Sequence, residues 1–137
     1  MTEIDRLSAG KYLSLTTIKR DGTPVATAVW VARDGEHLYV VTPVDTGKAK
    51  RLRHTSRVLL APCDVRGNLT GHQVEGSARL LDAEGTAAAG RLIDAKYGLV
   101  SRFAGIVDVA IRNRGKSRER VGIEISVDEP AQRVGDD

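Results

Sequence analysis

The stretch that decides the fold is residues 11–42, KYLSLTTIKRDGTPVATAVWVARDGEHLYVVT. It contains three runs rich in β-branched residues, at 11–20, 25–31 and 37–42. Asp-Gly pairs, which tight hairpin turns favour, separate these runs. Along the second run, Val or Thr at odd positions alternates with Ala or Trp at even positions, as in a strand with two different faces. This pattern predicts three consecutive strands in an antiparallel meander.

The rest of the chain adds more strands and several helices. Apolar and alternating runs predict three further strands, at 56–63, 72–81 and 121–127. Helical spacing predicts helices at 3–10, at 48–53, from Asp82 or Glu84 to about Tyr97 with Gly98 as the stop, and at 99–111. The sum is a mainly β fold with about six strands and most of the helix before the last strand. An antiparallel sheet of this size closes its edges by curling into a small barrel.

Bulk properties limit the function classes. The 137 residues suit a single domain, 1–137, with a frayed tail at 129–137. No apolar run approaches the roughly 18 residues of a membrane span, and no signal peptide is expected. Cys63 is the only cysteine, so a reducing cytoplasmic location is expected. A net charge of +3 suits an acidic ligand, whereas the 4% aromatic content is low for a nucleic-acid binder that stacks bases.

A basic segment, TGKAKRLR at 46–53, follows the third predicted strand. A strand that leads through Thr46 into a helix presents unpaired backbone N–H groups, and the helix dipole favours an anion there. Thr46 adds a hydroxyl, Lys48 a point charge, and Arg51 or Arg53 a planar fork. These groups suit a phosphate, while the alternative is a solvated basic helix face, and the residues alone leave both open. The Walker pattern GxxxxGK[ST] is absent.

No catalytic or metal-binding constellation stands out. The three histidines are scattered along the chain, at His37, His54 and His72. Cys63 ends an apolar strand with no base beside it, so neither a zinc site nor a thiol nucleophile is expected. Trp30 shares a strand face with the small Ala26 and Ala28, which either leaves room for a planar ring or reflects core packing. A phosphate cradle without catalytic groups still allows an enzyme whose cofactor performs the chemistry.

Three segments carry a family resemblance: RDGTPVATAVWV (20–31), LYVVTPVDTGKAKRLRHTSRVLLAPCDVRG (38–67) and VEGSARLL (74–81). Together they resemble the split β-barrel flavin and deazaflavin oxidoreductases, the superfamily of pyridoxamine 5′-phosphate oxidase. The likeness covers about 8–128 and is greatest to the actinobacterial reductases that use coenzyme F-420. It implies a six-stranded split barrel, and a homodimer with the cofactor in a groove between the subunits.

The resemblance also implies the site residues by position. The ring system would lie against the second strand, at Ala28, Val29 and Trp30. The cofactor phosphate would be held at the end of the third strand and in the basic turn, by Thr42, Thr46, Lys48 and Arg53. Lys50 would reach the same phosphate or the acidic tail of F-420. The catalytic residue is left unassigned, and no metal is expected.

The chain departs from pyridoxamine 5′-phosphate oxidases at two places. The second strand lacks their early arginine and late lysine, and the C-terminal end lacks their aromatic–arginine pair. These departures favour F-420 over FMN. The expected reaction is hydride transfer from reduced F-420 to a small electron-poor acceptor. The alternatives are an FMN-dependent oxidoreductase on the same barrel and a non-catalytic cofactor or tetrapyrrole carrier, because a fold does not determine its function.

Overall fold

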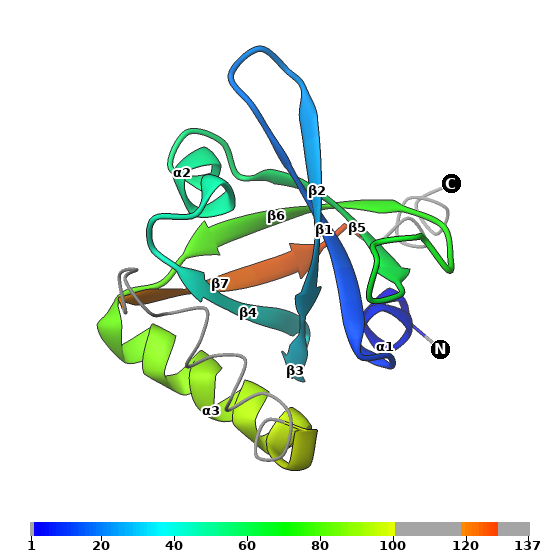
Figure 1. The fold of residues 1–137 in the computed structure, drawn as a ribbon, viewed down its shortest axis with the longest axis vertical. Helices are drawn as coiled ribbons and strands as arrows, with labels where there is room; N and C mark the ends of the chain where they lie inside the picture. Colours follow the sequence, from blue (N-terminus) through cyan, green and yellow to red (C-terminus); the bar gives the residue numbers. More distant parts are fainter. Residues whose placement is uncertain (1, 101–118, 129–137) are drawn as a thin grey trace, which may run out of the picture.

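The computed structural model describes residues 2–100 and 119–128 (Figure 1). Its strands are β1 (Tyr12–Ile18), β2 (Pro24–Trp30), β3 (Ala32–Asp34), β4 (His37–Pro43), β5 (Arg57–Cys63), β6 (Val74–Leu80) and β7 (Arg120–Val127). Its helices are α1 (Glu3–Ser8), α2 (Gly47–Leu52) and α3 (Ala83–Val100). The strands in the described part form one antiparallel sheet in the order β2-β1-β5-β6-β7-β4-β3.

The sheet curls because its two edges are consecutive in the chain. β2 and β3 lie at opposite edges of the strand order, yet only Val31 separates them in sequence. Edges joined through one residue cannot be far apart, so the sheet bends round toward closure. The predicted mainly β, antiparallel, curled fold with a helix before the last strand is confirmed. The described sheet has seven strands instead of six, because the chain changes partner at Val31: β2 pairs with β1, and β3 pairs with β4.

The predicted meander is wrong in its second half. The first Asp-Gly turn joins β1 to β2 as expected, with Gly22 at φ 92°. The second closes a hairpin at Gly35, φ 63°, but that hairpin joins the short β3 to β4. The other side of β4 pairs with β7, from the far end of the chain. A turn motif specifies only its local hairpin, so the second turn could not reveal that 25–31 belongs to the opposite edge.

Aliphatic side chains fill the interior of the curled sheet. The fully buried ones from the strands include Leu13, Leu15, Leu38, Val58, Leu60, Ile123 and Ile125. Ile4 and Leu7 of α1 and Leu52 of α2 join the same cluster. Six-residue helices are too short to be stable alone, so this burial is what holds α1 and α2 in place. The anchoring of α2 determines which face of the helix carries its charged side chains.

α3 covers the outer face of β3, β4 and β7 (Figure 1). It begins after Asp82, whose Oδ1 accepts the N–H of Gly85 at 2.8 Å, as predicted for a cap. Ile93 and Tyr97 are buried one turn apart. The predicted stop at Gly98 is wrong: the helix continues to Val100, because the packing of Tyr97 outweighs the cost of about 1 kcal/mol for a helical glycine.

Two predicted segments fall largely or wholly outside the described residues. The first two residues of the predicted helix at 99–111 continue α3, and the others are not described. The predicted tail at 129–137 is also outside. In the helices that are described, none combines the length and hydropathy needed to cross a membrane.

Gly76 gives a stability test of the close packing between β5, β6 and β7. A Cβ on Gly76 would lie 2.6 Å from the backbone oxygen of Ser126 and 2.9 Å from Leu60 Cδ1. We expect Gly76→Ala to lower the free energy of unfolding by about 1–3 kcal/mol, as overpacking does, in urea titrations. In the control Gly90→Ala, where nothing lies within 4 Å in α3, stability is expected to rise by up to about 1 kcal/mol. Equal effects of the two variants would contradict the packing described.

Candidate functional site

α2 begins just after β4, where the predicted basic segment lies. Thr46 caps the helix: its Oγ1 accepts the N–H of Ala49 at 3.4 Å and donates to the carbonyl of Pro43 at 3.0 Å. The buried hydroxyl of Thr42 lies 3.2 Å from the same Oγ1. The structure therefore brings the hydroxyls of Thr42 and Thr46 together. Their hydroxyls shape the turn that leads into the helix.

Arg51, one of the two arginines considered for this segment, lies over the start of α2. Its Nε donates to Oγ1 of Thr17 in β1 at 2.5 Å, and Thr17 is fully buried. A Cβ on Gly47 would lie 2.6 Å from Arg51 Nη1, so the absence of a side chain at Gly47 makes room for the guanidinium. Arg53 is exposed at the C-cap of the helix. The geometry thus favours Arg51 as the fork that faces an anion near this turn.

The Lys48 side chain is half-buried, and the positive charge of Arg51 acts on its amine. Burial first, and then that neighbouring charge, lower the pKa of Lys48 below its ordinary value. In the part of the chain that the structure describes, no carboxylate forms an ion pair with Lys48. A bound anion would offset the lowering of this pKa by burial and by Arg51, because a charge of opposite sign stabilises the protonated amine.

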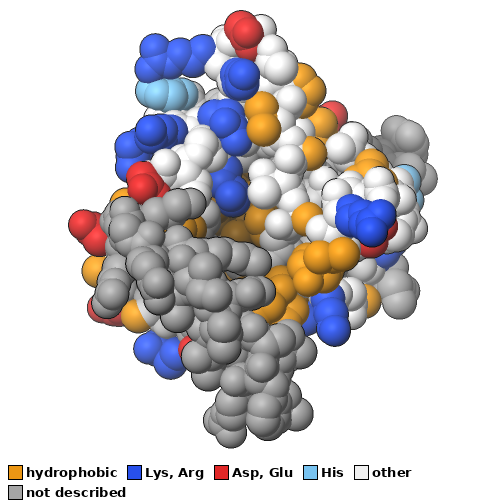
Figure 2. All heavy atoms as spheres, in the orientation of Figure 1, with side chains coloured by type: hydrophobic (Ala, Val, Ile, Leu, Met, Phe, Trp, Pro, Cys, Tyr) orange, Lys and Arg blue, Asp and Glu red, His pale blue; other side chains and the backbone are white. Residues whose placement is uncertain are grey.

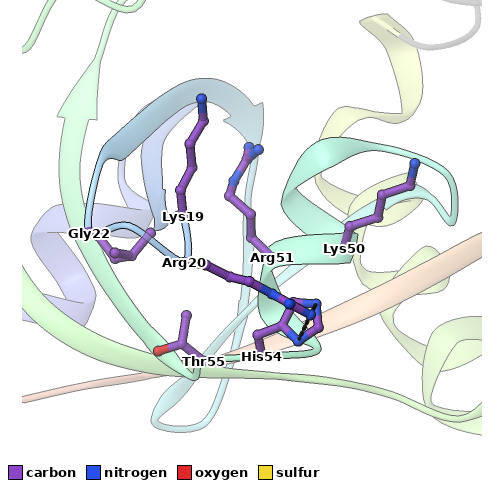
Figure 3. Close-up of a pocket in the computed structure, with 8 residues that line it drawn as sticks. Lys19, Arg20, Gly22, Lys50, Arg51, His54 and Thr55 are labelled. Atoms are coloured by element: carbon purple, nitrogen blue, oxygen red, sulfur yellow. Dashed lines mark hydrogen bonds between the residues drawn. The ribbon is translucent and has the colours of Figure 1, made fainter.

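A pocket of about 470 Å³ opens between the β1–β2 turn and α2 (Figure 3). Its lining residues are Ile18, Lys19, Arg20, Gly22, Lys50, Arg51, His54 and Thr55. Four of them are cationic and none is acidic. Figure 2 shows Lys and Arg side chains gathered over the turn and α2, at the upper left of the face drawn.

The pocket includes predicted and unpredicted residues. Lys50 was predicted and lines it, whereas Arg53 is absent from the lining. Sequence reasoning missed Lys19 and Arg20. The only available signal was a basic pair placed directly before the Asp-Gly turn, since the contact of that turn with α2 is not local.

The three predicted residues of β2 do not share one face. Ala28 and Trp30 lie on the outer face, while Val29 packs against the interior cluster. The Trp30 ring is stacked on the ring of Tyr97 in α3, with centroids 4.4 Å apart and an interplanar angle of 3°. Ala28 pairs with the buried Ser14 of β1. The outer surface of the hairpin is therefore lined by small side chains, with a fixed aromatic wall at one end.

Other titratable groups in the described residues do not assemble catalytic machinery. Tyr39 donates to Glu124 at 2.8 Å, and Arg79 donates to the same carboxylate at 2.8 Å. Burial and then this hydrogen bond raise the pKa of Tyr39 to about 12, so it stays protonated. Burial raises the pKa of the Cys63 thiol, which disfavours a thiolate nucleophile. Within residues 2–100 and 119–128, no group of three His, Cys, Asp or Glu side chains could hold a metal ion.

Comparison with solved structures shows the same fold in several proteins. The conserved hypothetical protein Rv2991 from Mycobacterium tuberculosis is 25% identical, with a TM-score of 0.62, over 93% of this chain and 81% of that one. An F-420 reductase is 19% identical, with a TM-score of 0.57, over 93% of this chain and 95% of that one. The heme storage protein HutZ from Vibrio cholerae is 16% identical, with a TM-score of 0.57, over 87% and 82% of the two chains.

Sequence comparison gives the family. No curated protein sequence matches the chain significantly. The family profile described as pyridoxamine 5′-phosphate oxidase matches residues 4–130, which is nearly the whole chain. That match and the curled antiparallel sheet agree, and the chain belongs to the pyridoxamine 5′-phosphate oxidase family.

Proposed function

We propose that this chain is an oxidoreductase that uses coenzyme F-420 and reduces a small electron-poor organic acceptor. The observation that carries the proposal is the set of cations around α2 that have no acidic partner in the described chain, beside a hairpin face of small residues. Membership of a family that includes oxidoreductases supports it. The fold shared with an F-420 reductase is compatible with it.

The residues fit an anionic cofactor. Lys48 and Arg51 would hold the phosphate, since the first is half-buried without a counter-ion and the second is fixed by Thr17. Thr42 and Thr46 would keep the turn in shape. Exposed side chains from the end of α2 would meet the outer part of the cofactor, at Lys50 and Arg53.

The small Ala28 would allow a planar ring to approach the outer face of β2. Trp30, stacked on Tyr97, would limit its position on one side. Val29 would contribute through its backbone, because its side chain packs inward. When bound, the deazaflavin supplies the hydride; the protein orients the ring and excludes water. We assign no proton donor.

A homodimer with a cofactor groove between the subunits is part of the proposal, as is a cytoplasmic location. Among the residues that the structure describes, the outer face of the β1–β2 hairpin offers a ring one wall. A second copy of the chain would cover the other side of the ring.

FMN is the alternative cofactor, because the resemblance of the sequence includes flavin-dependent oxidoreductases on the same barrel. A tetrapyrrole carrier is a weaker alternative, although haem storage or haem binding is named for two proteins of the same fold. Haem binding to a histidine would require a free imidazole, but two of the three rings are engaged. Arg20 contacts His54, and Glu3 contacts His72.

Fluorescence titration of the purified protein with F-420 and with FMN tests the proposal. We expect F-420 to bind with a micromolar dissociation constant, about −8 kcal/mol, and FMN to bind more weakly. Tighter binding of FMN than of F-420 would make FMN the cofactor in place of F-420. Absence of binding by both cofactors would contradict the proposed function.

Lys48→Ala tests the phosphate contact. We expect the binding free energy for F-420 to weaken by about 1.5–3 kcal/mol, as for loss of a charge-assisted hydrogen bond. Lys11→Ala is the matched control, because Lys11 is exposed and remote from α2 in the sequence and precedes β1. An affinity equal to that of the control would remove Lys48 from the site.

Sedimentation equilibrium tests the proposed dimer. Since the chain has a mass of 14.8 kDa, we expect a species of about twice that mass in the presence of F-420. A protein that binds F-420 as a monomer would refute the shared groove and leave the proposed cofactor in place.

A further inference from the structure

The pocket between the β1–β2 turn and α2 extends beyond the phosphate position proposed at Lys48. Lys19, Arg20 and Gly22 come from the turn, and none of them belongs to the basic segment 46–53. Lys50 and Arg51 of α2 complete the cationic lining. A volume of about 470 Å³ lies within the usual range for pockets that bind small molecules, about 300–1,000 Å³.

The cations of this pocket lack carboxylate partners. In the described chain, every ion pair involves other residues: Arg6–Glu3, Arg33–Asp5, Arg57–Glu75, His72–Glu3 and Arg79–Glu124. One carboxylate, that of Asp21, lies in the turn itself. Its Oδ1 accepts the N–H of Thr23 at 2.9 Å, which is the main reason for its lowered pKa. The charge of Lys19 lowers the same pKa further, although the two side chains form no ion pair. Arg20, Lys50 and Arg51 form no ion pair with a carboxylate in the described chain, so most of the positive charge in the pocket is left uncompensated.

Arg51 is held in a defined orientation at the centre of this set. Its Nε donates to the buried hydroxyl of Thr17, and its guanidinium lies over Gly47. The two terminal nitrogens keep their donors for a ligand, since the described residues provide no acceptor for them. In Figure 3 the Lys19 and Arg51 side chains extend in the same direction. A guanidinium fixed in this way loses less conformational freedom when it binds an oxyanion.

A second contact joins the turn to the helix. Nη2 of Arg20 lies 3.2 Å from Nδ1 and 2.9 Å from Nε2 of His54, as the dashed lines in Figure 3 show. This contact places the tip of the hairpin beside the residues that follow α2, so that charges from two distant segments surround one space.

We infer that this pocket is a subsite for a flexible small-molecule ligand with two or more anionic groups, carboxylates or phosphates, and that Thr17 is its positioning residue through Arg51. The concave form of the lining favours a small polyanion. The subsite does not require the proposed cofactor, because its lining suits a polyanion that is part of a cofactor and equally one that binds alone.

Titration calorimetry with sodium tripolyphosphate and with inorganic phosphate tests the subsite. We expect tripolyphosphate to bind at least about tenfold more tightly, because several charge-assisted contacts form at once. Lys19→Gln/Arg20→Gln should weaken tripolyphosphate binding about tenfold or more. Lys11→Gln/Arg66→Gln is the control, since it removes the same charge from exposed positions that do not line the pocket. Equal losses in the two double variants, or equal affinity for the two anions, would overturn the subsite.

The role of Thr17 is tested by a pair of variants that keep its volume or its hydroxyl. Thr17→Val should weaken tripolyphosphate binding without lowering the midpoint of thermal unfolding, and Thr17→Ser should restore the binding. Unchanged affinity in Thr17→Val would refute the positioning role.

A repeat of the titration with saturating F-420 separates the two sources of the polyanion. Loss of tripolyphosphate binding would assign the pocket to the acidic tail of that cofactor, and retention would assign it to a separate small molecule. If F-420 does not bind at all, the proposed function fails, while the tripolyphosphate titration still decides the subsite.

Discussion

Closure of the sheet depends on Val31, because at this residue the chain leaves one edge strand and enters the other. A fully buried residue that changes partners in this way has backbone groups outside both ladders. α3 satisfies them: the Val31 N–H donates to the Tyr97 hydroxyl at 3.0 Å, and Lys96 Nζ donates to the Val31 carbonyl at 2.9 Å. An unsatisfied buried group of this kind costs about 1–3 kcal/mol, so these contacts from the end of α3 stabilise the closure.

The same contacts fix the aromatic residues beside the β1–β2 hairpin. Tyr97 binds the backbone at Val31 and also stacks on Trp30, so the aromatic wall at one end of the β1–β2 hairpin has a fixed position. At the other end of the hairpin, Arg51 and Thr17 link α2 to β1. Both ends of this hairpin are thus tied to helices. The surface between them includes Ala28 on β2.

Local patterns predicted most elements, and non-local pairing accounts for what they missed. Alternation and Asp-Gly turns located β1, β2 and β4, and the i, i+3 spacing of Ala49 and Leu52 located α2. These signals extend over a few residues only. The pairing of β4 with β7 joins segments about 80 residues apart, and nothing in 37–42 indicates its partner.

The candidate site likewise contains some residues that local sequence patterns identify and others that only tertiary contacts identify. Thr46 and Lys48 were within reach of sequence reasoning, since cap and charge lie in one short segment. The choice between Arg51 and Arg53 depended on Thr17, 34 residues earlier, and the contribution of Arg20 depended on its contact with His54. These residues can be assigned to the candidate site only when the tertiary contacts are known.

Charge distribution is the strongest reason to regard the α2 region as a binding surface. Like charges about 4 Å apart repel by about 1 kcal/mol in water and about 4 kcal/mol near a protein surface, so a cluster without counter-ions costs stability. Four arginines elsewhere in the described chain avoid this cost, because Arg6, Arg33, Arg57 and Arg79 each face a carboxylate. Around α2 the chain instead keeps its cations unpaired and holds one of them in place with a buried hydroxyl. An anionic ligand would remove the repulsion between these cations. The free energy gained by removing it would add to the binding free energy of the ligand.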